Sequence, residues 1–332
     1  RRQLEQGLAL LHEVLARPKR AGRGPGAALD QDLVATERRN LERTLRSLGD
    51  DKERLAAQRC LEEACRGEAT ARETLGRLDA VGAVTPTALG ALHGHLLARA
   101  PVDVFLVADL GIRDAVRAVT RHLLWSGRAP RPTRLPAAAA VHPARSRPRR
   151  VVERDDVRQG KLALAWRAPI RPDGALLPAA AVLAGVLGGG SYGRLFQVVR
   201  EQHALCYYAD AQWMPAQGLM LATLGVDPEH EPRARRLVQR LAREVAAGQL
   251  DATALEGLRA SVQARVATLG DDRAAWLGWL QLRTILGLDP DARGWAHALE
   301  RVTPAQVRQV GRRLDLQVSY ALLPVDGERR RP

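Results

Sequence analysis

The sequence predicts an α+β fold in which a two-layer domain, helices packed on an antiparallel sheet, is used twice, with the first copy incomplete. A repeated helix-start signal predicts the duplication: Val84-Thr85-Pro86 and Val302-Thr303-Pro304 each offer a threonine cap followed by a proline in the first helical turn. Each signal opens an expected helix, Thr87–Leu97 or Ala305–Leu314, that leads into an apolar strand. The copies lie 218 positions apart, which indicates two homologous domains rather than a solenoid.

The first copy is expected to be mostly helical. A leucine every three or four residues between Leu4 and Leu15 predicts an amphipathic helix. A second helix is expected over 33–48, ending at the Asp50-Asp51 break, and a strand over Val102–Val107. When the opening strand and helix of the second copy are shifted back by 218 positions, their equivalents fall before Arg1. We therefore expect that the chain lacks roughly the first 60 to 90 residues of its natural first domain.

The second copy is expected to open with a strand over Lys161–Ala168 and a helix over 174–187. Strands Ala204–Met214 and Gly218–Val226 are expected to form an antiparallel hairpin beside that first strand. The remaining elements expected from apolar periodicity are three helices and a final strand, at 229–247, 252–269, 273–286 and Leu316–Tyr320.

The formal net charge of +14 raises a nucleic-acid or ribosome-proximal function as one alternative. Only three of the 51 basic residues are lysines, however, an arginine bias typical of a GC-rich genome. The most basic run, Arg128–Arg150, lies among prolines and contains no aromatic residue on which a base would stack. We expect a solvated interdomain linker over 126–156, suited to an acidic protein partner, a basic tail over 326–332, and no nucleic-acid partner.

The most informative segment runs from Leu187 to Tyr208. A glycine run ends one helix, a second short helix carries Arg194 to Gln202, and an aromatic strand follows at once. This segment resembles the C-terminal half of the M16 (insulinase, mitochondrial processing peptidase-like) zinc peptidases. The resemblance implies tandem domains of the LuxS/MPP-like metallohydrolase fold, with residues 1–125 the C-terminal portion of the first domain and 157–325 the second. The residues in register with the family signature are Arg194, Leu195, Arg200, Glu201, Leu205 and Tyr207.

The resemblance implies that Arg200 and Tyr207 bind substrate. An arginine offers a rigid fork of donors to a peptide carbonyl or carboxylate, and a tyrosine hydroxyl can donate to a developing oxyanion. The alternative reading is that Arg200 is a surface charge at a helix end and that Tyr207 belongs to the core.

The zinc chemistry of the family is not visible in this sequence. The motif His-x-x-Glu-His does not occur in the 332 residues, and His12-Glu13 and His93-Gly-His95 lack its spacing. The position of the third zinc ligand falls on Thr44, whose neutral hydroxyl cannot replace a carboxylate. A shift in the alignment that restores Glu42 or Glu37 stays open. We expect no catalytic residue, no metal site and no cofactor in this chain.

Three further segments resemble one branch of the family, the YfmF-like group associated with the aminopentanol modification of elongation factor P. Members of that branch generally lack the zinc motif and occur beside a sibling that keeps it. The resemblance thus implies a non-catalytic subunit that forms a heterodimer with a zinc-bearing sibling and helps to hold peptide substrate. The segments are Ser47–Arg54, Arg59–Glu68 and Pro101–Leu110.

Two alternatives to this function remain. The first is a zinc endopeptidase whose His-x-x-Glu-His segment lies upstream of Arg1. The second is a purely structural subunit.

The cysteines, the tryptophans and the hydropathy each give a further prediction. Cys60, Cys65 and Cys206 fit neither a metal quartet nor a disulfide framework, so buried thiols in a reducing cytoplasm are expected. No apolar run is long enough for a membrane span. Trp276 and Trp279 lie three apart on one helix face; core packing is favoured for them, and a peptide-binding platform stays open.

Overall fold

The computed structural model describes residues 2–23, 27–100, 102–123, 144 and 147–325. They form two compact units that do not follow chain order. The first unit comprises residues 1–47 and 74–135, and the second comprises residues 48–73 and 136–332. The tail expected at 326–332, and most of the linker expected at 126–156, lie outside the described residues.

The first unit is helical in its described part. Its helices are α1 (Arg2–Ala16), most of α2 (Gln31–Asp50), α4 (Leu78–Val81), α5 (Pro86–Arg99) and α6 (Ile112–Leu123). The apolar stripe of α1 is confirmed, since Leu8 is buried against Ala118 and Leu123 of α6, as expected for an amphipathic helix. Thr85 caps α5 as the sequence predicts, its side chain accepting a hydrogen bond from the amide of Ala88.

The prediction of a strand over Val102–Val107 is wrong. Residues 102–107 have no regular secondary structure, and Val102 and Val104 are largely exposed. A strand requires a neighbour for its backbone hydrogen bonds, and the described part of the first unit contains no strand that would pair with this segment. In the described part of the unit, this alternating apolar segment therefore has no strand with which to form backbone hydrogen bonds.

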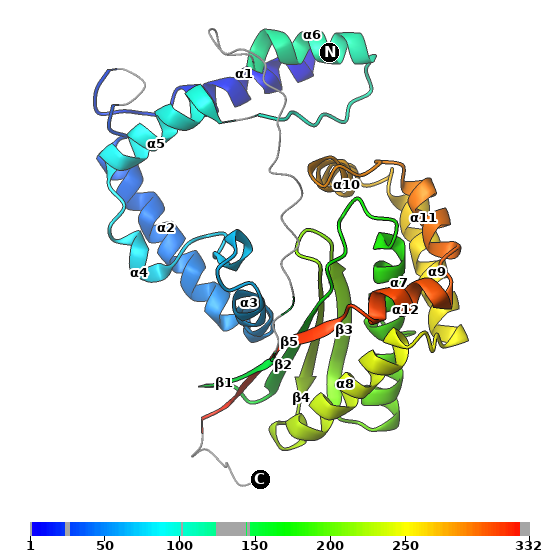
Figure 1. The fold of residues 1–332 in the computed structure, drawn as a ribbon. Coiled ribbons are helices and arrows are strands. Elements are labelled where there is room, and N and C mark those ends of the chain that lie inside the picture. Colours follow the sequence, from blue (N-terminus) through cyan, green and yellow to red (C-terminus); the bar gives the residue numbers. More distant parts are fainter. Residues whose placement is uncertain (1, 24–26, 101, 124–143, 145–146, 326–332) are drawn as a thin grey trace. The chain divides into compact units, whose positions relative to one another are not determined.

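The second unit is built on a five-stranded sheet in the order β1-β5-β2-β4-β3 (Figure 1). The predicted hairpin of β3 (Cys206–Met214) and β4 (Leu219–Val226) is confirmed, and β4 lies beside β2 (Gly160–Arg167). All pairings are antiparallel except that of β1 (Arg149–Asp155) with β5 (Asp315–Pro324), which is parallel. Strand β1 lies inside the range expected to be linker; it is an edge strand, where charged residues are tolerated because one side stays in water.

Helices cover both faces of the central strands, which explains why every residue of β2 except Lys161 is buried. Leu162, Leu164 and Trp166 point into the larger core under α7 (Leu177–Gly188), α8 (Glu231–Ala246) and α12 (Pro304–Gly311). Ala163 and Ala165 point to the opposite face, which α3 (Lys52–Ala64) covers with small side chains four residues apart (Figure 1). The predicted α+β class is confirmed, and α3 adds a helix to the second face. The outer helices are α9 (Ala252–Thr268), α10 (Arg273–Ile285) and α11 (Ala292–Glu300).

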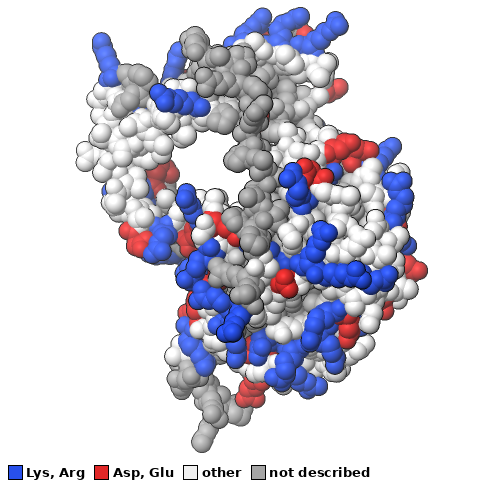
Figure 2. Space-filling model, viewed as in Figure 1, with Lys and Arg blue, Asp and Glu red and all other residues white. Residues whose placement is uncertain are grey.

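Much of the positive charge of the second unit lies at its surface. Figure 2 shows Lys and Arg side chains over the visible face of this unit, with Asp and Glu side chains between them. Local ion pairs neutralise part of this charge, as in Arg235–Glu231 (3.0 Å) and Arg240–Glu244 (3.6 Å) on α8. Within the described ranges, no helix combines the length and the apolar character needed to cross a bilayer.

Candidate functional site

The glycine run after α7 lets two backbones meet. A Cβ atom built on Gly188 would lie 2.2 Å from the backbone nitrogen of Ala211 on β3, so only glycine fits between the end of α7 and the strand. Gly190 has φ +88°, a conformation that side-chain-bearing residues rarely adopt. The run therefore turns the chain tightly against β3 and delivers it to the segment that carries Arg194 to Tyr207.

Three backbone irregularities occur between Leu195 and Tyr207. The segment η2 (Leu195–Gln202) is a π-helix, a rare form that is frequent at functional sites. Ala204 follows with φ +50°, which is strained for a residue with a side chain. Tyr207 is then the extra residue of a β-bulge, because Cys206 pairs with Val226 while Tyr208 pairs with the preceding Gly225. Bulges of this kind re-aim a side chain, and they are common beside binding sites.

The bulge presents the side chain of Tyr207 to solvent, with 60% of the residue exposed. Arg200 is also exposed, and its guanidinium lies over the ring of Phe196, 4.6 Å from the centroid. The nearest carboxylate is that of the adjacent Glu201, at 3.6 Å. In the described structure, no hydrogen bond joins Arg200 to Tyr207. Both donors thus remain available for an external acceptor.

The neighbouring tyrosine has a different environment, which sequence reasoning missed. Tyr208 is half-buried, with the Nζ atom of Lys161 5.3 Å from its ring centroid. Burial, and then the carboxylate of Glu53 on α3, raise the pKa of the Tyr208 hydroxyl. Tyr208 therefore ties β3 to β2 and α3. Two adjacent tyrosines give no sequence signal for which of them faces outward; the bulge decides it.

The position expected for a third zinc ligand holds no ligand set. Thr44 is exposed on α2 and donates its hydroxyl to the carbonyl oxygen of Asn40 at 3.0 Å, and Glu42 pairs with Arg46 at 3.5 Å. His93 is a structural residue: Nε2 donates to the carbonyl oxygen of Leu15 at 2.7 Å, and Nδ1 accepts from Arg20 at 2.7 Å. Among the residues that the structure describes, no three His, Cys, Asp or Glu side chains are grouped to hold a metal ion.

The three cysteines are free and buried, as the sequence predicts. Burial raises the pKa of the Cys60 and Cys65 thiols, and it raises the pKa of Cys206 to about 11 although the positive charge of Arg200 lowers it. The thiolate is the reactive form.

We therefore expect negligible alkylation of the native chain by iodoacetamide at pH 8, where roughly one thousandth of the Cys206 thiol is ionised. All three thiols should react after unfolding in guanidinium. Intact-mass spectrometry measures the number of adducts, and rapid labelling of the native chain at any cysteine would contradict this burial.

The structure thus contains both capped helix starts, a sheet covered on both faces, and a glycine turn that leads to an exposed arginine and tyrosine. A family model described as "Peptidase M16 inactive domain" matches residues 84–262, more than half of the chain. The chain belongs to this family, and the predicted resemblance to the M16 peptidases is confirmed.

Known relatives agree with this membership. The "Probable inactive metalloprotease YmfF" of Bacillus subtilis strain 168 is 24% identical over 325 residues, which is 98% of this chain and 74% of the relative. A conserved protein of Enterococcus faecalis V583 has the same fold, with a TM-score of 0.85, 23% identity, and coverage of 98% and 75% of the two chains. A peptidase M16 inactive domain from Pseudomonas fluorescens gives a TM-score of 0.77 at 18% identity, covering 98% and 76%.

Proposed function

We propose that this chain is a non-catalytic subunit that pairs with an active, zinc-bearing M16 sibling in the cytoplasm and holds peptide substrate with Arg200 and Tyr207. The bulge at Tyr207 carries this proposal. It turns a tyrosine outward at the start of a strand whose next residue, Tyr208, is engaged inside the unit. A bulge and a strained Ala204 both destabilise the local backbone, so their occurrence beside two exposed donors favours a binding role over a packing role.

The chemistry of the two side chains suits a peptide. The guanidinium of Arg200 is always charged and donates in a fixed fork, which matches a peptide carbonyl or a carboxylate. The Tyr207 hydroxyl donates one hydrogen bond and accepts others. In this proposal the sibling supplies the metal and the base, and this chain supplies hydrogen-bond donors that position the peptide backbone.

The test is reconstitution of the full chain with its zinc-bearing sibling. We expect Arg200→Ala and Tyr207→Phe each to lower the peptidase rate of the pair, Arg200→Ala by about 10- to 100-fold, because a hydrogen bond to a charged group contributes about 1.5–3 kcal/mol. Tyr207→Phe should have a smaller effect, since its hydrogen bond is neutral.

Matched controls come from the same unit. Tyr208→Phe removes the hydroxyl of the inward-facing neighbour, and Arg236→Ala removes an exposed arginine of α8. Both should leave the rate nearly unchanged. If Arg200→Ala and Tyr207→Phe also leave the peptidase rate unchanged in a correctly assembled pair, the two side chains do not hold the substrate. Only a scaffold role for this chain would then survive.

A further inference from the structure

The arginines of the second unit are not spread evenly over its helices. Residues 251–301, which include α9, α10 and α11, contain six arginines and seven carboxylates, so their formal charges nearly cancel. Residues 240–248 and 304–313, at the end of α8 and along α12, contain five arginines and one carboxylate. An arginine bias of the genome acts on the whole chain, so it does not explain why the excess is concentrated in these two segments.

The two segments form one surface, because the backbones of α8 and α12 are in close contact. A Cβ atom built on Gly311 of α12 would overlap the carbonyl oxygen of Ala246 of α8. Gly248, just after α8, has φ +82°, and a Cβ atom there would lie 2.8 Å from the Cγ atom of Arg308. Figure 2 shows Lys and Arg side chains gathered over these helices. The exposed arginines of this α8–α12 surface are Arg240, Arg243, Arg308, Arg312 and Arg313.

Little of this positive charge is neutralised within the fold. The carboxylate of Glu244, which belongs to the same segments, lies 3.6 Å from the guanidinium of Arg240 and 3.5 Å from that of Arg194. Arg243 donates a hydrogen bond to the carbonyl oxygen of Gln239 at 3.2 Å, which leaves its charge uncompensated. In the described part of the chain, the four arginines of the surface other than Arg240 form no ion pair. The α8–α12 surface therefore presents guanidinium groups that an external anion can bind.

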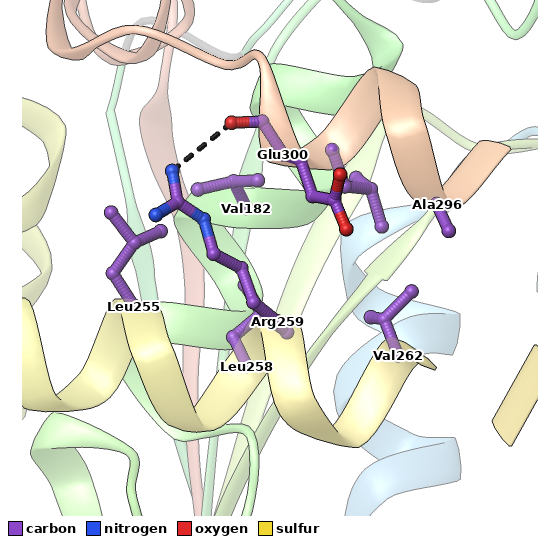
Figure 3. A pocket seen from close by; sticks show the side chains of 8 residues that line it. Val182, Leu255, Leu258, Arg259, Val262, Ala296 and Glu300 are labelled. Atoms are coloured by element: carbon purple, nitrogen blue, oxygen red, sulfur yellow. Dashed lines mark hydrogen bonds between the residues drawn. The ribbon is translucent and has the colours of Figure 1, made fainter. Parts of the chain in front are cut away.

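Arginines elsewhere in the second unit are used inside the fold. Figure 3 shows Arg259 of α9, which donates to the carbonyl oxygen of Glu300 of α11 at 3.0 Å, beside a small cavity lined mainly by apolar side chains. Arg149 of β1, at the end of the expected linker, pairs with Glu63 of α3 at 2.6 Å. The arginines of the α8–α12 surface differ from these because their donors point to solvent rather than to a partner in the unit.

From this charge distribution we propose that the α8–α12 surface binds an acidic segment of a protein partner. The guanidinium fork of an arginine matches a carboxylate in a bidentate geometry. Complementary charge raises the association rate and fixes the orientation of the partner more than it raises affinity. The proposal goes beyond the proposed function, since neither Arg200 nor Tyr207 belongs to this surface.

The surroundings of the surface favour a polypeptide over other polyanions. Residues 240–248 and 304–313 contain no aromatic residue on which a single-stranded base would stack. They also contain no exposed large apolar side chain, which a helix needs to enter a membrane interface. A nucleic acid is a continuous polyanion and would run past the surface, onto the exposed Asp315 or onto residues 251–301, which carry no net positive charge. A short acidic segment can end where the arginines end.

The spacing of the arginines indicates the form of this segment. Arg240 and Arg243 are three residues apart on α8, and Arg308 and Arg312 are four residues apart at α12, so each pair lies along one side of its helix. Such a pair spans about 4.5–6 Å along the helix axis. A partner helix with a carboxylate at every third or fourth position has the same spacing, so its side chains can meet successive arginines.

The test uses the full chain and a fluorescein-labelled peptide of alanine with glutamate at every third or fourth position. The peptide has about 16 residues, because shorter helices are marginal in water. Its counterpart carries glutamine at the same positions, and binding is measured by fluorescence anisotropy at about 50 mM salt. We expect the glutamate peptide to bind at least about 10-fold more tightly, and its affinity to fall as salt is raised, because salt screens exposed charges.

A triple variant tests the surface. Arg243→Gln, Arg308→Gln and Arg312→Gln together remove three exposed charges, and glutamine keeps a polar side chain at each helix surface. We expect the triple variant to bind the glutamate peptide about 10-fold more weakly, since several exposed ion pairs of modest strength are lost together. Its midpoint of urea unfolding should equal that of the unchanged chain.

The matched control removes the same net charge from other helices of the unit. Arg265→Gln, Arg273→Gln and Arg293→Gln together alter one exposed arginine each on α9, α10 and α11. This control should bind the glutamate peptide normally. Equal weakening by both triple variants would mean that the peptide responds to the net charge of the chain alone, and it would overturn the proposal.

A second probe distinguishes the class of partner. A fluorescein-labelled DNA duplex of about 20 base pairs should bind more weakly than the glutamate peptide and respond equally to the two triple variants. Tighter binding of the duplex, lost in the surface variant alone, would assign the surface to a nucleic acid instead.

The outcome is separable from that of the proposed function. Arg200→Ala should bind the glutamate peptide as the unchanged chain does, whatever its effect on the peptidase rate of the pair. Equal binding of the glutamate and glutamine peptides would remove the acidic partner without bearing on Arg200 and Tyr207.

Discussion

Replacing Arg167 with methionine is expected to lower the free energy of unfolding by about 3–5 kcal/mol. Arg167 ends β2 and is only 1% exposed. Its Nη2 atom donates to Glu68 at 2.7 Å and to the carbonyl oxygen of Ala64 at 3.1 Å. Methionine matches the arginine stem but removes the cation that pairs with the largely buried Glu68 carboxylate, which is the costly way to break a buried ion pair.

Urea unfolding followed by circular dichroism measures this effect. The matched control is Arg171→Met, which removes an arginine that makes two hydrogen bonds of 2.8 Å to Asp173 in an exposed position. An exposed pair contributes about 0–1 kcal/mol, so the control should unfold almost normally. The double variant Arg167→Met with Glu68→Leu should recover part of the loss, because the buried carboxylate that Arg167 neutralises is then removed as well. Equal effects at positions 167 and 171 would contradict the buried pair.

The Arg167 pair also shows what the sequence could not predict. Glu68 lies 99 positions before Arg167, and Lys52 bonds Asp155 at 2.7 Å across a similar separation. These contacts place α3 on the sheet of the second unit, although α3 precedes most of the first unit in the chain. Sequence periodicity identifies a helix and its apolar face, but it does not identify the distant surface that the face covers.

Structural features that depend on residues close together in the sequence were predicted well. The capping box of Thr303 and Gln306 is present in full, because both partners lie in the same helical turn. The hairpin of β3 and β4 likewise follows from alternation on either side of a short turn. The prediction of a strand over Val102–Val107 was wrong, because a strand also needs a neighbouring strand, which no local sequence pattern reveals.

The candidate site was likewise predictable from the sequence only in part. The signature indicated Arg200 and Tyr207 as the residues of interest, and their exposure is consistent with that hypothesis. The bulge that separates Tyr207 from Tyr208 depends on the pairing with β4 and was not visible in the sequence. A cleft of the second unit unites residues of β3, α9, α10 and α11, and among its aromatic residues the sequence indicates only Trp279 as a possible binding residue.

Replacing Gly188 with valine is expected to destabilise the second unit by about 3 kcal/mol. A Cβ atom at this position would lie 2.2 Å from the backbone nitrogen and 2.5 Å from the Cβ atom of Ala211. The obstacle is a backbone in the middle of β3, which is held by its ladder to β4 and cannot rotate away as a side chain would. The strand or the end of α7 must therefore shift, and packing in the core beneath them is lost.

Gly278→Ala is the matched control. Gly278 is helical, in α10, and no atom lies within 4 Å of the position of a Cβ. Alanine there should stabilise the chain by about 0.5–1 kcal/mol, because glycine loses more conformational freedom on folding. Opposite signs for the two glycines in urea unfolding would establish that contact, rather than helix propensity, requires glycine at position 188.

The Gly188→Val variant should also affect the candidate site, because it changes the position of β3. Because Gly188 sets the distance between α7 and β3, a shift at Ala211 also moves the bulge at Tyr207 four residues earlier. Gly188→Val should therefore also lower the peptidase rate of the reconstituted pair, even under conditions in which the chain stays folded. A valine variant of normal stability would mean that α7 and β3 do not meet backbone to backbone, and the rigid placement of Tyr207 would then lose its physical basis.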